Sequence, residues 1–168
     1  DRPLVIIGDP GAILDGEGAR ELITVTAPDV TIRGLTFRNT GRSRHQDRAA
    51  LHLDGATACS IESNRFDDTF FAVYLTDTVG CRVVGNIMRG TPGAESATGN
   101  AIHYWGSRHL LVSGNRIAGH RDGVYLEFTR HATVRDNISE SNSRYGLHFM
   151  YADSSAYEAN VFRANGSG

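Results

Sequence analysis

GVYLEFTRHATVRDNIS (residues 123–139) and GLHFMYADSSAYEANVF (146–162) decide the fold, because they are two copies of one pattern. Each copy holds a short stretch of alternating apolar residues, a polar turn, a second alternating stretch and then an asparagine. Alternation of this kind is typical of β-strands. Its recurrence at a fixed interval indicates a repeat protein in which each unit stacks on the next.

The same pattern occurs six times along the chain. The first strands are LITV (22–25), ALHL (50–53), AVYL (72–75), AIHY (101–104), GVYL (123–126) and GLHF (146–149). The second strands are VTIRGLTF (30–37), CSIESNRF (59–66), CRVVGNIM (81–88), LLVSGNRI (110–117), ATVRDNIS (132–139) and SAYEANVF (155–162). The register is marked by Asn64, Asn86, Asn115, Asn137 and Asn160, with Leu35 at this place in the first repeat.

The asparagines are separated by 22, 29, 22 and 23 residues. This period is too short for two packed helices but sufficient for three short strands with turns. The 19 glycines and the β-branched residues also favour strands. Since parallel crossovers are right-handed, we predict an all-β, right-handed parallel β-helix of the pectin-lyase-like type, with about six to seven three-sided coils. The asparagines are expected to stack in the core as an amide ladder.

Alternation along the first strand of each coil predicts which side chains form the core. The inward positions are Ile23, Leu51, Val73, Ile102, Val124 and Leu147, together with Val25, Leu53, Leu75, Tyr104, Leu126 and Phe149. One outward file is Thr24, His52, Tyr74, His103, Tyr125 and His148, and the other is Thr26, Asp54, Thr76, Trp105, Glu127 and Met150. Histidines, tyrosines, an indole and a thioether are unusual at solvated positions. We therefore interpret this outer wall as the functional surface.

Length and composition limit the possible domain organisation and binding partners. The chain of 168 residues with 40% hydrophobic content suits a single domain spanning 1–168. A net charge of −2 gives no basic stripe for nucleic acid. No apolar run approaches the roughly 20 residues of a membrane-spanning helix. The chain starts at Asp1 and ends in AsnGlySerGly, so we expect a fragment of a longer solenoid from which any signal peptide has been removed.

Two coils carry insertions, TGRSRHQDRA (40–49) and GTPGAESATGN (90–100). Both enter the strand that bears the outer wall, two coils apart. We expect them to protrude as neighbouring loops along one edge of the wall, as a docking rim or as tolerated surface insertions.

Cys59 and Cys81 each lie five residues before a ladder asparagine, so they should be stacked neighbours with inward side chains. In-register Cβ atoms lie about 4.8 Å apart, beyond the usual 3.5–4.5 Å of a disulfide. Buried thiols are therefore favoured over a disulfide, and a two-thiolate metal site is favoured least.

His148 and Met150 form the best local candidate for a metal site, since they lie two residues apart on one strand. Imidazole and thioether suit copper, and soft sulfur selects Cu(I). Tyr125 and Glu127 lie on the neighbouring coil. His103 is two coils away, about 9.6 Å along the axis, and would have to move to join the pair.

Arg121 and Arg144 should also stack on neighbouring coils. Such a guanidinium pair suits the carboxylates of a partner or a sugar acid, although salt bridges to Asp122 or Glu140 explain it more simply.

Enzyme chemistry on this wall would depend on Glu127, Tyr125, His148 and Arg144, which could abstract a proton from a uronic acid. Asp54 lies three coils from Glu127, about 14 Å along the stack. This separation exceeds the 6.5–9.5 Å of an inverting glycosidase.

Several segments resemble the NosD family of periplasmic β-helix proteins. They are AILDGEG (12–18), APDVTIRGLTFRNTG (27–41), HRDGVYLEFT (120–129) and DNISESNSRYGLHFMYADS (136–154). The most specific part is SRYGLHFMY (143–151), because generic β-helix proteins share the Gly and Asn punctuation without this run. The resemblance covers nearly the whole chain, although family members are longer.

This resemblance implies a secreted periplasmic scaffold rather than a catalyst. It would act with an ATP-binding cassette (ABC) transporter and a copper chaperone to complete the copper-sulfur centre of nitrous-oxide reductase. Within the motif, the match carries over to Tyr145, His148 and Met150. Direct copper binding by these residues is left open.

We therefore expect an assembly platform whose outer wall binds a partner protein. The expected binding residues are His52, Tyr74, His103, Trp105, Tyr125, Glu127, Arg144, Tyr145, His148 and Met150. The alternative is a carbohydrate lyase or epimerase, because that class uses the same fold. The absence of a carboxylate pair disfavours a saccharide substrate.

Overall fold

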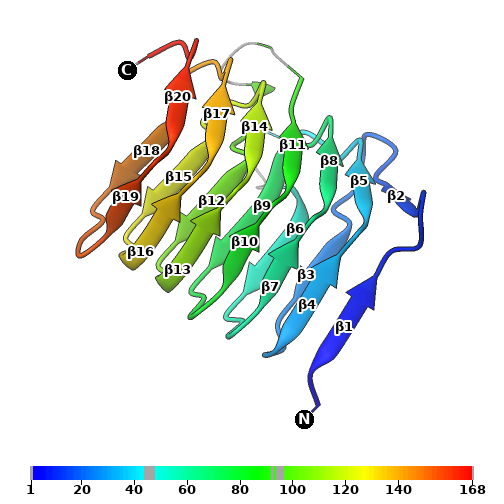
Figure 1. The fold of residues 1–168 in the computed structure, drawn as a ribbon. Helices are drawn as coiled ribbons and strands as arrows, with labels where there is room; N and C mark the ends of the chain where they lie inside the picture. The colour runs from blue at the N-terminus through cyan, green and yellow to red at the C-terminus, as the bar shows by residue number, and fades with distance from the viewer. Residues whose placement is uncertain (1, 44–47, 92, 94–96, 168) are drawn as a thin grey trace.

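Three parallel β-sheets wrap around one core in the computed structural model, which describes residues 2–43, 48–91, 93 and 97–167. The sheets contain seven, seven and six strands. Each strand pairs in parallel with its counterparts in the adjacent coils, except that the first and last strands of each sheet have one neighbour, and the two termini lie at opposite ends of the stack (Figure 1). The predicted parallel β-helix is confirmed.

Each of the three sheets takes one strand from each coil. The first sheet contains β1 (Leu4–Ile7), β4 (Val30–Arg33), β7 (Ser60–Glu62), β10 (Arg82–Val84), β13 (Arg108–Ser113), β16 (Arg130–Arg135) and β19 (Ala156–Glu158). The second contains β2 (Ile13–Asp15), β5 (Thr36–Arg38), β8 (Arg65–Asp67), β11 (Ile87–Arg89), β14 (Arg116–Ala118), β17 (Ile138–Glu140) and β20 (Val161–Arg163). The third contains β3 (Ile23–Val25), β6 (Ala49–Asp54), β9 (Phe71–Thr76), β12 (Ile102–Trp105), β15 (Val124–Glu127) and β18 (Leu147–Met150).

The asparagine corner corrects one prediction. Each segment that we interpreted as a single second strand is two strands, one in the first sheet and one in the second. The chain turns because the residue before each asparagine, or before Leu35, has a positive φ, which ends the extended conformation. These residues are Gly34 (73°), Ser63 (52°), Gly85 (65°), Gly114 (66°), Asp136 (57°) and Ala159 (51°).

The predicted amide ladder is confirmed at this corner. Asn64, Asn86, Asn115 and Asn137 each donate from Nδ2 to the Oδ1 of the next asparagine, at 3.2, 3.1, 2.9 and 2.9 Å. The ladder pairs polar atoms that would otherwise be buried without partners. A second ladder that we did not predict joins Asn142 Nδ2 to Asn165 Oδ1 at 3.0 Å.

The inward rows form the core as expected, with Leu51, Val73, Ile102 and Val124 fully buried. Ile23 and Leu147 are partly buried against the same core. Phe149 is the exception, because it is 54% exposed although it pairs in register with the buried Leu126. It lies in the last of the six coils of the third sheet, where no further described strand covers it.

Cys59 and Cys81 are both buried and free, as we expected. Their thiols contact each other, and this contact, followed by burial, raises the pKa of Cys81. The pair therefore contributes to packing rather than to a covalent cross-link.

Candidate binding surface

A column of stacked rings runs up the third sheet, one ring from each of five consecutive strands. It consists of His52 (β6), Tyr74 (β9), His103 (β12), Tyr125 (β15) and His148 (β18). Successive ring centroids lie 5.1, 4.9, 4.6 and 4.4 Å apart. The predicted register is confirmed, because in-register parallel strands place these residues directly above one another.

The prediction that the whole column faces solvent is wrong for its central rings. His103 and Tyr125 are each only 8% exposed, whereas His52, Tyr74 and His148 are half-buried. Each central ring is covered by the rings above and below it, and Phe71 packs 5.8 Å from His103. Stacking within the column thus excludes water from positions that strand alternation alone assigns to the surface.

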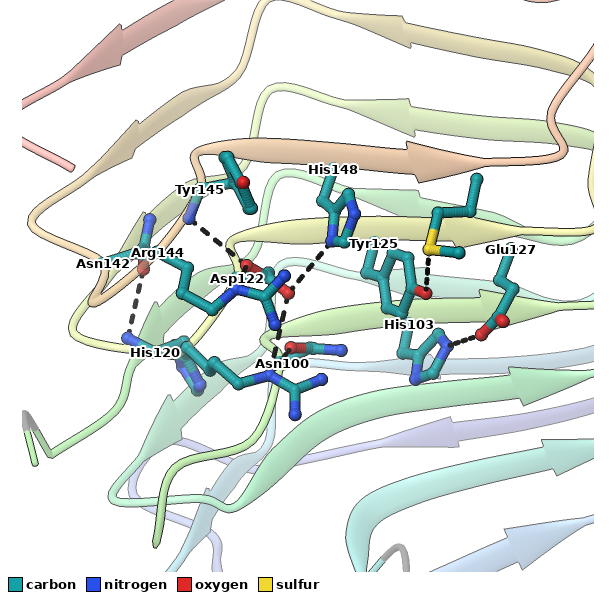
Figure 2. A network of polar contacts seen from close by, with 12 residues as sticks. Asn100, His103, His120, Asp122, Tyr125, Glu127, Asn142, Arg144, Tyr145 and His148 are labelled. Carbon is teal, nitrogen blue, oxygen red and sulfur yellow. Dashed lines mark hydrogen bonds and ion pairs between the residues drawn. The ribbon is translucent and has the colours of Figure 1, made fainter. Parts of the chain in front are cut away.

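His103 has unusual electrostatics for a buried histidine. Neither of its ring nitrogens has a hydrogen-bond partner, and Nε2 lies 3.7 Å from Glu127 Oε2 (Figure 2). Burial lowers the pKa of His103 to about 3, with smaller contributions from the charges of Arg121 and His148. The imidazole is therefore neutral at physiological pH despite the nearby carboxylate.

The second outward file carries Trp105, Glu127 and Met150 next to the column. Trp105 and Met150 are 40% and 38% exposed, and Glu127 is half-buried. The Tyr125 hydroxyl donates to Met150 Sδ at 3.1 Å. Burial, followed by the negative charge of Glu127, raises the pKa of Tyr125 to about 12, so it remains a phenol.

Asp122 lies at the centre of a polar cluster at the opposite end of the wall, whereas we predicted it only as one possible salt-bridge partner of the two arginines. Its carboxylate is fully buried, and its oxygens lie 3.7 Å from Arg121 Nε, 3.7 Å from Arg144 Nε and 3.4 Å from His148 Nδ1 (Figure 2). The Tyr145 amide donates to it at 3.2 Å. The salt-bridge interpretation of the two arginines is confirmed for Asp122. A buried carboxylate requires such partners.

An exposed aromatic edge lies where the chain leaves the third sheet, and we define it as Trp105, Phe128 and Tyr151. Phe128 and Tyr151 are 49% and 73% exposed, and their rings stack 4.8 Å apart. Both have a positive φ, 51° and 52°, at the position occupied by Gly55 and Gly106 in other coils. We did not predict Phe128 and Tyr151 as part of the surface, although aromatic residues at a turn position favoured by glycine are a recognisable signal.

The two insertions meet beside the wall, as expected. Arg42 forms an ion pair with Asp68 and donates to the Ala97 carbonyl oxygen at 3.4 Å. The parts of the predicted loops at 44–47, 92 and 94–96 lie outside the described residues.

The described part of the outer wall brings few metal-binding side chains together. Within the described ranges, no three His, Cys, Asp or Glu side chains gather as a metal site would require. His148 and Met150 share one face of β18, but each faces a different partner, Asp122 and Tyr125 respectively. Both ring nitrogens of His103 are buried without a hydrogen-bond partner, and copper binding stays a prediction.

Residues 21–168 match the family model described as "Right handed beta helix region". Over 125 residues the chain is 38% identical to a Pseudomonas aeruginosa protein and 30% identical to a Stutzerimonas stutzeri protein, both named "Probable ABC transporter binding protein NosD". Each alignment covers 73% of this chain and 29% of the relative, so the chain spans less than a third of the length of these relatives.

Solved structures share the fold. A putative glycosyl hydrolase from Parabacteroides merdae superposes with a TM-score of 0.73 at 9% identity, covering 95% of this chain and 81% of that one. The DFA-IIIase of Arthrobacter chlorophenolicus superposes with a TM-score of 0.59 at 16% identity, covering 81% of this chain and 31% of the enzyme. At these identities the likeness shows the fold alone. Within the described part of the chain, no helix is long and apolar enough to span a membrane.

Proposed function

The chain belongs to the right-handed β-helix family and is NosD-like, and from this premise we propose that it is a periplasmic assembly subunit whose outer wall binds a partner protein. In this proposal the subunit associates with an ABC transporter, as the names of its relatives state for those proteins. The partner at the wall is a copper chaperone or nitrous-oxide reductase during assembly of the copper-sulfur centre. These partners come from the family resemblance.

The proposal is based mainly on the solvent exposure of the aromatic edge. Trp105, Phe128 and Tyr151 expose 40%, 49% and 73% of their surface, although each ring offers a large apolar area. Exposed apolar patches of this kind mark interaction surfaces. Holding Phe128 and Tyr151 at a positive φ costs roughly 1–3 kcal/mol each, so folding stability does not explain their presence.

Other side chains of the same wall complement this edge. Glu127 and Met150 lie next to it, and Arg121 and Arg144 lie at the other end of the same wall. Interfaces commonly combine an apolar centre rich in aromatic residues and Met with a polar rim. A thioether also adapts its shape to different partners. We therefore assign the centre of the binding surface to the aromatic edge, with Glu127 beside it and the two arginines at the far end of the wall.

Replacing Phe128 and Tyr151 with glycine tests the proposal. Glycine suits a positive φ, so the double variant should fold while losing both rings. We expect affinity for immobilised reductase or chaperone to fall at least about tenfold, which corresponds to about 1.4 kcal/mol. The His148→Ala and Met150→Ala double variant should also bind more weakly.

The matched control is Ile87→Thr, because Ile87 is 37% exposed on β11 in the second sheet, away from the wall. Its affinity should equal that of the wild type. Unchanged binding by both wall variants, with circular dichroism showing intact folding, would contradict the docking surface.

The second candidate function is that of a carbohydrate lyase or epimerase. We consider it because the chain shares its fold with the putative glycosyl hydrolase. Glu127 faces His103 rather than a second carboxylate, so the carboxylate pair of a glycosidase is not formed at this position. Turnover of alginate or pectin fragments that Glu127→Gln abolishes would replace the docking proposal with an enzyme.

A further inference from the structure

A row of basic side chains lies at the corner where the chain passes from the third sheet to the first. Arg108 on β13 pairs in register with Arg130 on β16. The next residues are His109 and His131, whose rings stack with centroids 4.9 Å apart and planes 10° from parallel. All four residues are exposed, and we define them as the basic row.

Folding stability does not account for the basic row. Arg108 lies directly opposite Arg130, and like charges in this position destabilise a pair of strands. In the described part of the chain, Asp153 is the only acidic residue that forms an ion pair with the row, at 3.2 Å from Arg130 Nε. The side chains of Arg130 and Asp153 are 70% and 57% exposed, so their attraction is weakened by water. The row therefore presents an excess of positive charge to solvent.

The basic row continues the aromatic edge around the corner. Phe128 comes two residues before Arg130, and Trp105 comes three residues before Arg108. The turns that join β12 to β13 and β15 to β16 belong to neighbouring coils, so the edge and the row both run along the stack (Figure 1). A protein that covers the aromatic edge therefore meets the basic row as well.

The residue types of the row indicate which ligand it fits. Recognition of an anionic lipid surface takes clusters of about four to eight Lys or Arg residues, whereas the row has two arginines. A net charge of −2 gives no support for nucleic acid. Guanidinium groups bind carboxylates through two parallel hydrogen bonds, and an imidazole adds a further N–H donor. The acidic side chains of a protein segment match these donors best.

We infer that the basic row binds an acidic segment of the partner protein, while the aromatic edge packs against apolar side chains of the same segment. This inference rests on the proposed function and deepens it by stating the chemistry of the partner. Coils are about 4.8 Å apart, and alternate side chains of an extended segment are about 6.6 Å apart, a difference that flexible arginines span. Because the Arg130–Asp153 pair is exposed, a carboxylate of the partner can replace Asp153.

Fluorescence anisotropy with the whole chain tests the row. The probe is a dye-labelled peptide that alternates glutamate with tryptophan, and the control probe has glutamine in place of glutamate. Wild-type protein should bind the glutamate peptide at least about tenfold more tightly. The double variant Arg108→Gln and Arg130→Gln should lose this preference. The matched control, Arg89→Gln with Arg116→Gln, removes the same charge from exposed positions of the second sheet and should bind within about twofold of the wild type.

A second double variant, His109→Gly with His131→Gly, tests the two imidazoles. Both residues have a positive φ, 57° and 54°, which glycine adopts readily. We expect this variant to unfold at about the wild-type temperature while binding the glutamate peptide about threefold more weakly. Unchanged peptide binding would remove the histidines from the site.

Equal binding of the two peptides by the wild type, or an equal loss of binding in the second-sheet control, would overturn the inference. Co-sedimentation with phosphatidylserine vesicles, without any preference for the glutamate peptide, would replace the acidic segment with a membrane surface. A preference for the glutamate peptide without binding of reductase or chaperone would contradict the docking function alone. Conversely, partner binding that Arg108→Gln and Arg130→Gln leave intact, but that loss of the aromatic edge abolishes, would contradict only the basic row.

Discussion

At the scale of single residues, burial controls the charge of two histidines. His103 and His120 are 8% and 1% exposed, and burial lowers their pKa values to about 3 and about 4. In an unfolded chain both would titrate near 6.5. Between these values the unfolded chain binds more protons than the folded chain, so protons favour unfolding in this range.

The free energy of unfolding of the metal-free protein should therefore fall as pH decreases from about 7.5 to 5, through the unfolded pKa near 6.5. The lowered pKa values of His103 and His120 produce this effect. His103→Phe removes one of the two groups and should reduce the slope. Urea unfolding at several pH values measures it, and an identical slope in the variant would show that His103 is not buried as a neutral imidazole.

At the scale of elements, the asparagine corner adds side-chain hydrogen bonds between coils to those made by the strands. Without these bonds, buried polar atoms at the corner would lack partners. Asn115 Oδ1 accepts from the backbone N–H of Asn86 at 2.9 Å, and Asn115 Nδ2 donates to the Val83 carbonyl oxygen at 2.9 Å. Asn115 is 1% exposed, so no water replaces these bonds. Asn115 thus links its own coil to the coils on both sides.

Asn115→Ala should destabilise the domain by roughly 2–4 kcal/mol, because it leaves the Asn86 amide and the Val83 carbonyl buried without partners. Asn160→Ala is the matched control. Asn160 is only half-buried and ends the described ladder, so its loss should cost less. Chemical denaturation compares the two, and equal losses of stability would argue against the ladder as the cause.

At the scale of the whole molecule, stability depends on contacts between neighbouring coils, since each coil buries its core side chains only against the next. Tyr104 in a central coil is fully buried, whereas Phe149, Tyr157 and Phe162 in the last coil are 54%, 36% and 39% exposed. The central coils are therefore expected to open least.

Hydrogen-deuterium exchange should show this gradient directly. Amides of β18, β19 and β20 should exchange faster than those of β9, β10 and β12, because fewer buried contacts oppose their opening. Mass spectrometry of proteolytic peptides resolves the two groups. Uniform protection along the chain would mean that it unfolds as one cooperative unit rather than coil by coil.

The amino-acid sequence by itself determined the coil register, the amide ladder and the inward rows. Strand alternation and the spacing of the asparagines are local properties that recur in every coil, so each repeat supports the same interpretation. The neighbours Leu51 and Val73, or Asn115 and Asn137, follow directly from that register. The family resemblance also came from contiguous segments.

Only the tertiary structure decided how the wall is covered and charged. The enclosure of His103, the burial of Asp122 and the stacking of Phe128 on Tyr151 depend on side chains from different coils. The split of each second strand at the asparagine also appears only in three dimensions. The physical reason is that alternation assigns a side chain to a face of a sheet, whereas its burial and charge depend on the atoms that pack against it.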